Sequence, residues 1–226
     1  MKLSVVIPAY NEEKTVAEII RRVQAVPLEK EIIVVDDGST DRTGEILKEI
    51  ASSGRVKVIF QERRQGKGAA LRRGFAQVSG EVIVVQDADL EYHPGDFVRL
   101  LEPIQKGRAR IVYGSRILGK NPFSYLRYWL GGLFLSKLTN ILYGSKITDE
   151  PTCYKMFRRE ILQEIDLKCE GFEFCPEFTA KVLRRGEKIL EVPISYSPRS
   201  MAAGKKIRWK DGFVAVYTLI KYRIVK

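Results

Sequence analysis

Five short apolar runs, separated by longer amphipathic segments, constrain the fold of this chain more than any other feature. The runs are rich in Val and Ile, and they are LSVVIP (3–8), EIIVVD (31–36), VKVIF (56–60), EVIVVQD (81–87) and ARIVYG (109–114). Nearly continuous β-branched runs are typical of strands that are covered on both faces, as in parallel sheets.

Segments with a helical pattern lie between these runs. They are residues 12–26, where Val16, Ile19, Ile20 and Val23 share one face, and residues 41–52, 67–78 and 96–105. The second is expected to begin with Asp41 as a capping residue. Strands that alternate with helices of this length predict βαβ units, and therefore an α/β fold with a mostly parallel sheet sandwiched by helices.

Polar loops follow four of the predicted strands at the point where each strand ends. These loops read PAYNEE, DDGSTD, ERRQGKG and DADLE in chain order. In parallel sheets the ligand lies at the carboxyl ends of the strands. Each loop alone is compatible with ordinary turn chemistry, but together they predict a single site.

The loop after the fourth strand carries three acids, Asp87, Asp89 and Glu91. Residues two apart on an extended chain point the same way, so Asp87 and Asp89 can bind one target. Glu91 joins them if the extended backbone continues. Carboxylate oxygens suit Mg²⁺ or Mn²⁺, and the sequence therefore predicts a divalent cation site formed by these three residues.

Two other loops admit both a functional and a structural interpretation. Asp37 could accept hydrogen bonds from a base or a ribose, whereas Asp36 could be structural and Asp41 a simple cap. The segment RRQGKGAALRRG lacks the pattern of a Walker phosphate loop. Its glycines could still open a helix whose first amides and Lys67 face a phosphate.

The charge of the chain is strongly basic and unevenly distributed. Lys and Arg total 39 against 28 acids, and residues 196–226 hold eight basic residues and one acid. Such a surplus predicts a phosphate-rich partner, which could be a nucleic acid, an anionic lipid or a phosphorylated small molecule. The chain shows no nucleic-acid-binding motif. It also shows no signal peptide, no membrane-spanning run and no paired-cysteine motif, so a cytoplasmic location is expected.

Two amphipathic segments mark the second half of the chain, residues 123–143 and 211–226. Their apolar faces are formed by Leu126, Leu130, Leu133, Phe134 and Leu138 in the first, and by Phe213, Val216, Tyr217, Ile220 and Ile224 in the second. Such faces could dock on a membrane surface, or they could pack on the protein's own core or across a dimer interface.

The motifs VVIPAYNEE, VVDDGSTDRT, GKGAALRRG, DAD, YGSR and DEPTCYKMF occur in this order. In this respect the chain resembles the inverting family-2 glycosyltransferases with the GT-A fold, and is most similar to their dolichol-phosphate mannose synthase-like branch. The resemblance implies a nucleotide-sugar-binding half at 1–120. Residues 121–226 would then form the acceptor-binding half and the amphipathic helices of the same catalytic domain.

The resemblance also implies roles for individual residues. The donor nucleotide would be cradled by Pro8, Ala9, Tyr10, Glu12, Val35 and Asp37, and also by Asp87 and Ala88. Asp89 would be the principal metal ligand. Arg116, Arg199 and Lys205 match positions that bind phosphates of donor or acceptor. The position of Glu91 is often glutamine in the mannose synthases, so this departure puts mannose itself in question.

The implied reaction is direct displacement at the anomeric carbon of a GDP- or UDP-sugar, with Mg²⁺ or Mn²⁺ on the leaving diphosphate. A polyprenyl phosphate acceptor is ionised near neutrality, since its second pKa is about 6, and needs no general base. A hydroxyl acceptor would need one, and Glu177 is the candidate, while Asp149 is expected to organise the site. A non-catalytic nucleotide-sugar or nucleic-acid binder is the third possibility. For the enzyme, we expect peripheral contact with the cytoplasmic face of a membrane, as a homo-oligomer or beside a membrane-protein partner.

Overall fold

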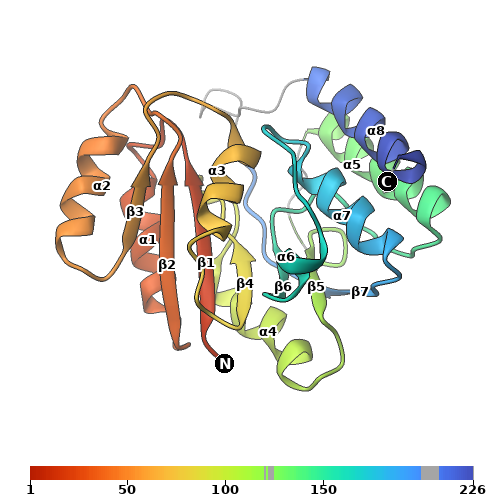
Figure 1. Ribbon diagram of the computed structural model, residues 1–226, viewed down its shortest axis with the longest axis horizontal. Coiled ribbons are helices and arrows are strands. Elements are labelled where there is room, and N and C mark those ends of the chain that lie inside the picture. Colours follow the sequence, from red (N-terminus) through yellow and green to blue (C-terminus); the bar gives the residue numbers. More distant parts are fainter. Residues whose placement is uncertain (120, 122–124, 200–208, 226) are drawn as a thin grey trace.

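The computed structural model describes every residue except 120, 122–124, 200–208 and 226, and its described strands form one seven-stranded sheet (Figure 1). The strand order is β3-β2-β1-β4-β6-β5-β7. Their bounds are β1 (Leu3–Ala9), β2 (Lys30–Asp36), β3 (Lys57–Phe60), β4 (Val82–Val85), β5 (Ile111–Ser115), β6 (Lys155–Arg158) and β7 (Ile189–Pro193).

Most of the strand pairs are parallel, which confirms the predicted class of sheet. The pairs β1–β2, β1–β4, β2–β3 and β5–β7 run parallel, whereas β6 runs antiparallel to both of its neighbours, β4 and β5. All five strands that the apolar runs predict are present. The sequence did not reveal β6, which comes from the second half of the chain and inserts beside β4.

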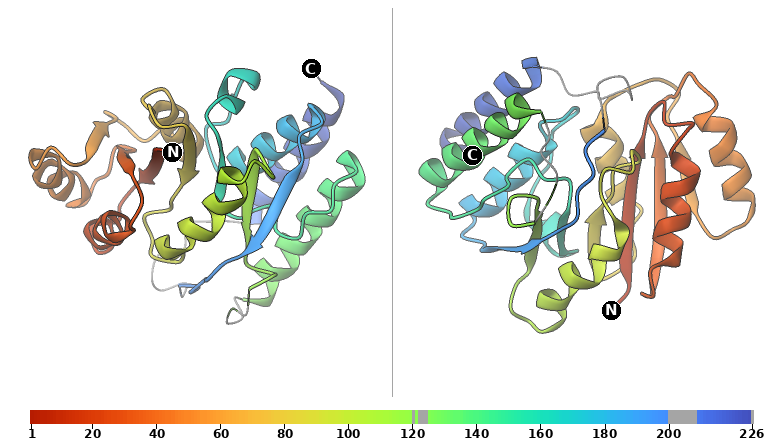
Figure 2. Two further views of the ribbon diagram at one scale, coloured as in Figure 1. Left: turned by 90° about the horizontal axis from the view of Figure 1, so that it is seen from below. Right: turned by 180° about the vertical axis from the view of Figure 1, so that it is seen from behind.

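Helices lie on both sides of this sheet, with α1 and α3 on opposite faces (Figure 2). The helical elements are α1 (Val16–Ala25), α2 (Thr43–Ser52), α3 (Lys67–Phe75), the 3₁₀ turn η1 (Pro94–Asp96), α4 (Phe97–Gln105), α5 (Leu126–Tyr143), α6 (Ile161–Glu164), α7 (Phe174–Arg184) and α8 (Trp209–Ile224). The Asp41 carboxylate accepts a hydrogen bond from the Thr43 N–H at 2.9 Å, so it stabilises the start of α2 as predicted.

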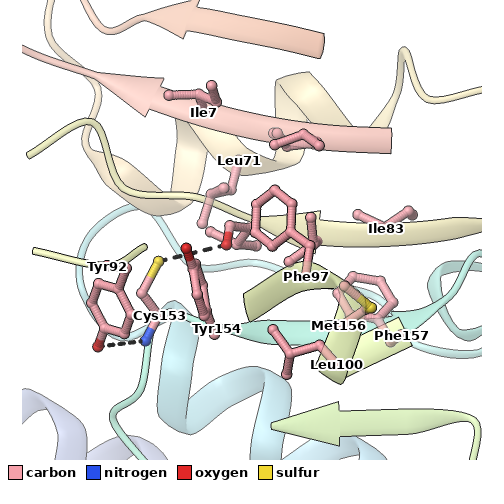
Figure 3. Close-up of a cluster of buried hydrophobic side chains, with 14 of the residues drawn as sticks. Ile7, Leu71, Ile83, Tyr92, Phe97, Leu100, Cys153, Tyr154, Met156 and Phe157 are labelled. Atoms are coloured by element: carbon pink, nitrogen blue, oxygen red, sulfur yellow. Dashed lines mark hydrogen bonds between the residues drawn. The ribbon is translucent and has the colours of Figure 1, made fainter. Parts of the chain in front are cut away.

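The core lies on both faces of the central strands. Every described residue of β4 is buried, and the side chains of α4 and β6 pack beside it (Figure 3). The Tyr92 hydroxyl accepts a hydrogen bond from the Cys153 N–H at 3.1 Å, which ties the loop after β4 to the segment before β6. The prediction that every strand is covered on both faces is wrong for β3. It is an edge strand, and Lys57 and Phe60 are exposed.

Helices α5, α7 and α8 pack together at the end of the molecule farthest from β3 (Figure 1). The Tyr143 hydroxyl of α5 donates to the Leu219 carbonyl of α8 at 2.6 Å. None of the described helices combines the length and the apolar character that crossing a bilayer requires.

The apolar faces that the sequence predicts on α5 and α8 point largely to solvent. In α5, Leu126, Leu130 and Phe134 are 52–62% exposed, and in α8, Phe213, Tyr217 and Ile224 are 64–75% exposed. The buried sides are smaller and more polar, with Ser136 and Thr139 in α5 and Ala215, Thr218, Leu219 and Tyr222 in α8. These stripes therefore face solvent for the most part, although Leu138 packs against the small buried cluster that α5 forms with α7 and α8.

Candidate active site

A cleft of about 1940 Å³ opens at the carboxyl ends of the parallel strands. Segments that follow β1, β2, β3, β4 and β5 all contribute to its wall, as the polar loops predicted. On the other side, the cleft extends to residues of α5, α7 and α8. The predicted site residues that line it are Pro8, Ala9, Tyr10, Glu12, Asp37, Lys67, Asp87, Ala88, Asp89, Glu91, Arg116 and Arg199.

One residue predicted to cradle the nucleotide is not in the cleft. The Val35 side chain is fully buried in β2 and does not line the cleft, so it cannot contact a ligand there. A contact of the donor with the backbone of Val35 stays a prediction. Lys205 lies outside the described residues.

Asp37 is in the cleft wall, but its carboxylate is already engaged by the protein. It accepts hydrogen bonds from the Gln61 side chain at 2.8 Å and from the backbone N–H groups of Gln65 and Gly66 at 2.7 and 2.8 Å. The side chain is nearly inaccessible to solvent. Asp37 therefore shapes the loop before α3.

The start of α3 is closed by a second segment of the chain. Gly66 has a φ of 105°, and a Cβ at this position would lie 2.3 Å from the Glu170 carbonyl oxygen. That same carbonyl accepts a hydrogen bond from the Ala69 N–H at 3.0 Å, so this amide is not available to a phosphate. Lys67 still faces the cleft and pairs with Asp87 at 2.6 Å. Burial lowers the pKa of Lys67, but the Asp87 charge outweighs it and the net shift is upward.

The three acids predicted to bind a metal do not converge on one point. Among the described residues, no three Asp, Glu, His or Cys side chains form a metal-binding group. Leu90, between Asp89 and Glu91, adopts a left-handed conformation with a φ of 63°. The Glu91 carboxylate accepts hydrogen bonds from other parts of the chain, and its role as a metal ligand stays a prediction.

Glu91 holds the segment between β7 and α8. Its carboxylate accepts hydrogen bonds from the Tyr196 hydroxyl at 2.6 Å and from the Arg199 N–H at 3.1 Å, and its carbonyl accepts one from the Ser197 N–H at 2.8 Å. No local pattern indicates this role, because the side-chain partners of Glu91 are more than 100 positions away.

Arg199 brings a guanidinium into the acid cluster. Its Nη1 lies 3.2 Å from both carboxylate oxygens of Glu12, and its Nη2 lies 3.0 Å from Oδ2 of Asp89. Burial raises the pKa of Asp89, and the neighbouring charges of Asp87 and Glu91 raise it further, while Arg199 opposes them. The acid cluster thus attracts positive charge, and the Arg199 guanidinium provides it in this structure.

The donor set fits a divalent cation that is shared with a substrate. Mg²⁺ is commonly held by one or two carboxylates together with substrate phosphates, and an all-protein cage is not required. Asp87 and Asp89 provide two such carboxylates on the cleft wall. They are the residues that would hold Mg²⁺ or Mn²⁺ here.

Arg116, in the cleft wall, is held by Asp149. Oδ2 of Asp149 accepts hydrogen bonds from the Arg116 backbone N–H and from Nε, each at 2.8 Å, and Oδ1 accepts one from Nη2 at 2.7 Å. The guanidinium also lies over the Tyr196 ring, 5.2 Å from its centroid. Asp149 therefore fixes the orientation of Arg116 in the cleft wall, which agrees with the expectation that it organises this part of the chain.

Glu177 does not line the cleft. It is 1% exposed, its carboxylate accepts hydrogen bonds from the N–H groups of Lys168 and Cys169 at 2.8 and 2.6 Å, and it forms an ion pair with Lys181. Burial raises the pKa of Glu177, but these partners outweigh it and the net shift is downward. A base role is therefore not supported, and Glu177 is a structural acid.

Two further contacts were not evident from the sequence. Arg64 lies over the Tyr10 ring, 4.5 Å from its centroid, and both residues line the cleft. Asn121 donates to the carbonyls of Arg116 and Ile194 and accepts from the Tyr196 N–H, so it joins the segments that follow β5 and β7. Arg64 lies in the predicted loop ERRQGKG, but neither its contact with Tyr10 nor the role of Asn121 could be read from that pattern.

Comparison with known proteins places these features in a family. Residues 4–166 match the family model described as Glycosyl transferase family 2. The chain is 33% identical over 233 residues to a dolichol-phosphate mannosyltransferase of Pyrococcus furiosus, covering all of this chain and 64% of that protein. It is 35% identical over 219 residues to a polyprenol monophosphomannose synthase of Mycolicibacterium smegmatis, covering 89% of this chain and 79% of the relative.

The fold of this chain also matches that of a solved structure. Glucosyl-3-phosphoglycerate synthase from Mycobacterium tuberculosis, in complex with Mn²⁺, UDP and glucosyl-3-phosphoglycerate, superposes with a TM-score of 0.71 at 24% identity. The match covers 98% of this chain and 78% of that one. This likeness supports the GT-A fold that the motifs implied.

Proposed function

The chain belongs to glycosyl transferase family 2, and we propose that it transfers a sugar from a nucleotide-sugar to a polyprenyl phosphate in a metal-dependent, inverting reaction. One observation carries this proposal. A single cleft joins the acids that follow β4 to α5 and α8, whose outer faces expose large apolar side chains. A lipid acceptor can reach the donor site from that side.

On the donor side, the acids that follow β4 and the paired side chains of Tyr10 and Arg64 define how the nucleotide-sugar binds. Asp87 and Asp89 would hold Mg²⁺ or Mn²⁺, which would neutralise charge on the leaving diphosphate. Lys67 lies beside Asp87 and can pair with a phosphate oxygen. The stacked Tyr10 and Arg64 side chains offer a flat surface to a base. These features fit a GDP-sugar and a UDP-sugar equally.

On the acceptor side, the groups lining the cleft suit a phosphate. Arg116 is fixed by Asp149 with one side of the guanidinium toward the cleft, and guanidinium groups bind phosphate oxygens strongly. A lipid monophosphate with a second pKa of about 6 is its own nucleophile near neutrality. The engagement of Glu177 by the backbone and by Lys181 is consistent with a reaction that needs no base at that position.

The exposed faces of α5 and α8 support contact with a membrane surface. Apolar helix faces bind bilayers by burying side chains at the headgroup boundary. The names of the two relatives, a dolichol-phosphate mannosyltransferase and a polyprenol monophosphomannose synthase, are consistent with a lipid acceptor. Contact with the cytoplasmic face is part of the proposal.

The experiment is a transfer assay with radiolabelled GDP-mannose and UDP-sugars, Mn²⁺ and membrane extract. The proposal predicts a labelled product that partitions into organic solvent and is labile to mild acid. Asp89→Asn should abolish this product, because it removes a carboxylate from the cation. A labelled product that stays in the aqueous phase would refute the lipid phosphate and would support a hydroxyl acceptor.

A further inference from the structure

Arg199 contacts carboxylates at the predicted cation site. Its guanidinium lies within 3.2 Å of Glu12 and within 3.0 Å of Asp89, the principal acid of the predicted cation site. A positive group among carboxylates marks the position where the local charge requires a cation. Asp89 thus has an internal cationic partner on a distant segment of the chain.

The fit of this guanidinium to its carboxylates is incomplete. Nε of Arg199 is buried without a hydrogen-bond partner among the described residues, and it lies 3.7 Å from Oε1 of Glu91. An unsatisfied buried donor costs free energy. A small divalent ion has no such directional requirement, so it can replace Arg199 at Asp89.

The segment that carries Arg199 is held independently of this contact. The Tyr196 hydroxyl and the Arg199 N–H both donate to the Glu91 carboxylate, and the Tyr196 N–H donates to Asn121. The backbone can therefore stay in place while the long side chain of Arg199 turns to another partner. A diphosphate bound with the cation would offer that partner nearby.

We infer that Arg199 and the divalent cation are alternative partners of Asp89, and that cation binding transfers the guanidinium from this carboxylate to the donor diphosphate. The inference rests on the proposed cation site at Asp87 and Asp89. Glu91 is the positioning residue in this exchange, because it anchors the backbone of Arg199. Competition from Arg199 weakens binding of the cation alone and leaves the site selective for a cation that arrives with a diphosphate.

The test measures binding of Mn²⁺ alone, without nucleotide, by electron paramagnetic resonance of the free ion. Wild type is compared with Arg199→Gln, Arg199→Lys and Arg64→Gln. The last is a matched control, since it also removes one positive charge from the cleft, but from a side chain that lies over Tyr10. Melting temperatures in EDTA and in Mn²⁺ check folding and give a second readout of binding.

The expected result is that Arg199→Gln binds Mn²⁺ at least roughly tenfold more tightly than wild type, because a competing charge at contact distance is gone. Arg64→Gln should change the affinity less than about threefold, since its charge is more distant and screened. The Mn²⁺ affinity of Arg199→Lys should lie between those of wild type and Arg199→Gln. Mn²⁺ should also raise the melting temperature of Arg199→Gln more than that of wild type.

Unchanged or weaker Mn²⁺ binding in Arg199→Gln would overturn the inference, as would equal gains in Arg199→Gln and Arg64→Gln. Asp89→Asn separates this failure from that of the proposed function. If Asp89→Asn binds Mn²⁺ as wild type does, the cation site itself is wrong. If Asp89→Asn loses Mn²⁺ while Arg199→Gln gains nothing, only the exchange is wrong.

Discussion

Replacing Asp149 by asparagine tests whether Arg116 depends on this carboxylate for its position. Asp149 is 2% exposed and accepts three hydrogen bonds from Arg116, two of them from the guanidinium. The asparagine oxygen can keep the two bonds made by Oδ2, but its amide NH₂ then faces the Nη2–H donor. The variant loses one charge-assisted bond and the negative charge of this bidentate pair, which leaves the buried Arg116 charge without its counterion.

The magnitude follows from these contacts. A hydrogen bond to a charged group contributes about 1.5–3 kcal/mol, and breaking a buried ion pair costs about 3–5 kcal/mol. Because the asparagine retains two of the three bonds, we expect a loss of about 3 kcal/mol in the free energy of unfolding. For a chain of this size that corresponds to a fall of roughly 6–12 °C in melting temperature.

The assay is urea and thermal unfolding of Asp149→Asn beside Asp166→Asn. Asp166 is the matched control, because its side chain is 80% exposed and its ion pair with Lys168 spans 3.5 Å. The control should unfold as wild type does. A fall of less than about 2 °C for Asp149→Asn would refute the reasoning, since a 3 kcal/mol loss could not produce so small a shift.

Three further predictions follow from other contacts. Gly66→Ala should lower the free energy of unfolding by at least about 2 kcal/mol in urea titrations, because its φ is 105° and the Glu170 carbonyl oxygen would lie 2.3 Å from the new Cβ. Gly107 is the control: it also has a positive φ, but a Cβ there would meet nothing within 4 Å. Gly107→Ala should therefore lose less stability. Glu31 should stabilise the fold above about pH 4.5 and lose that effect as the pH falls toward 2. Burial raises its pKa, but hydrogen bonds from Ser4, Ser79 and Gly80 outweigh burial and lower it to about 2. Unfolding should therefore show Glu31→Gln about 2 kcal/mol less stable than wild type at pH 6, with the difference reduced to less than about half of that at pH 3, the full shift being discounted for partial exposure. An equal difference at both pH values would contradict this. Phe134→Ser combined with Tyr217→Ser should weaken sedimentation with anionic lipid vesicles at least roughly tenfold, since two exposed aromatic side chains no longer enter the bilayer. Val98→Ser, on the exposed face of α4, is its control, and equal loss in both would refute a specific surface.

The sheet was predictable because its strands are marked by local composition. The Val and Ile runs of β1, β2 and β4 are buried on both faces, and burial is what such runs indicate. Strand β6 has the sequence KMFR, which carries no such run. Its pairing with β4 and β5 is decided by residues far away in the sequence, so no local pattern could predict it.

The site was predictable where a residue directly follows a strand. It was not predictable where distant partners or the position on a helix determine the direction of a side chain. Asp87, Asp89 and Glu91 line the cleft as expected, but Glu91 also accepts hydrogen bonds from Tyr196 and Arg199, which are more than 100 positions away in the sequence. In α7, Cys175 and Pro176 line the cleft, whereas Glu177 lies about 100° further round the helix and points into the interior. Sequence spacing alone does not fix these directions.

The proposed sugar transfer to a lipid phosphate is tested most directly by the structure of its product. Purified protein, Mn²⁺, the accepted nucleotide-sugar and a short polyprenyl phosphate are incubated, and the lipid is examined by ³¹P and ¹H NMR. We predict that the phosphate monoester signal is replaced by that of a phosphodiester whose sugar has the anomeric configuration opposite to the donor's. An unchanged monoester beside a sugar joined to a hydroxyl group, or a product with retained configuration, would contradict the account.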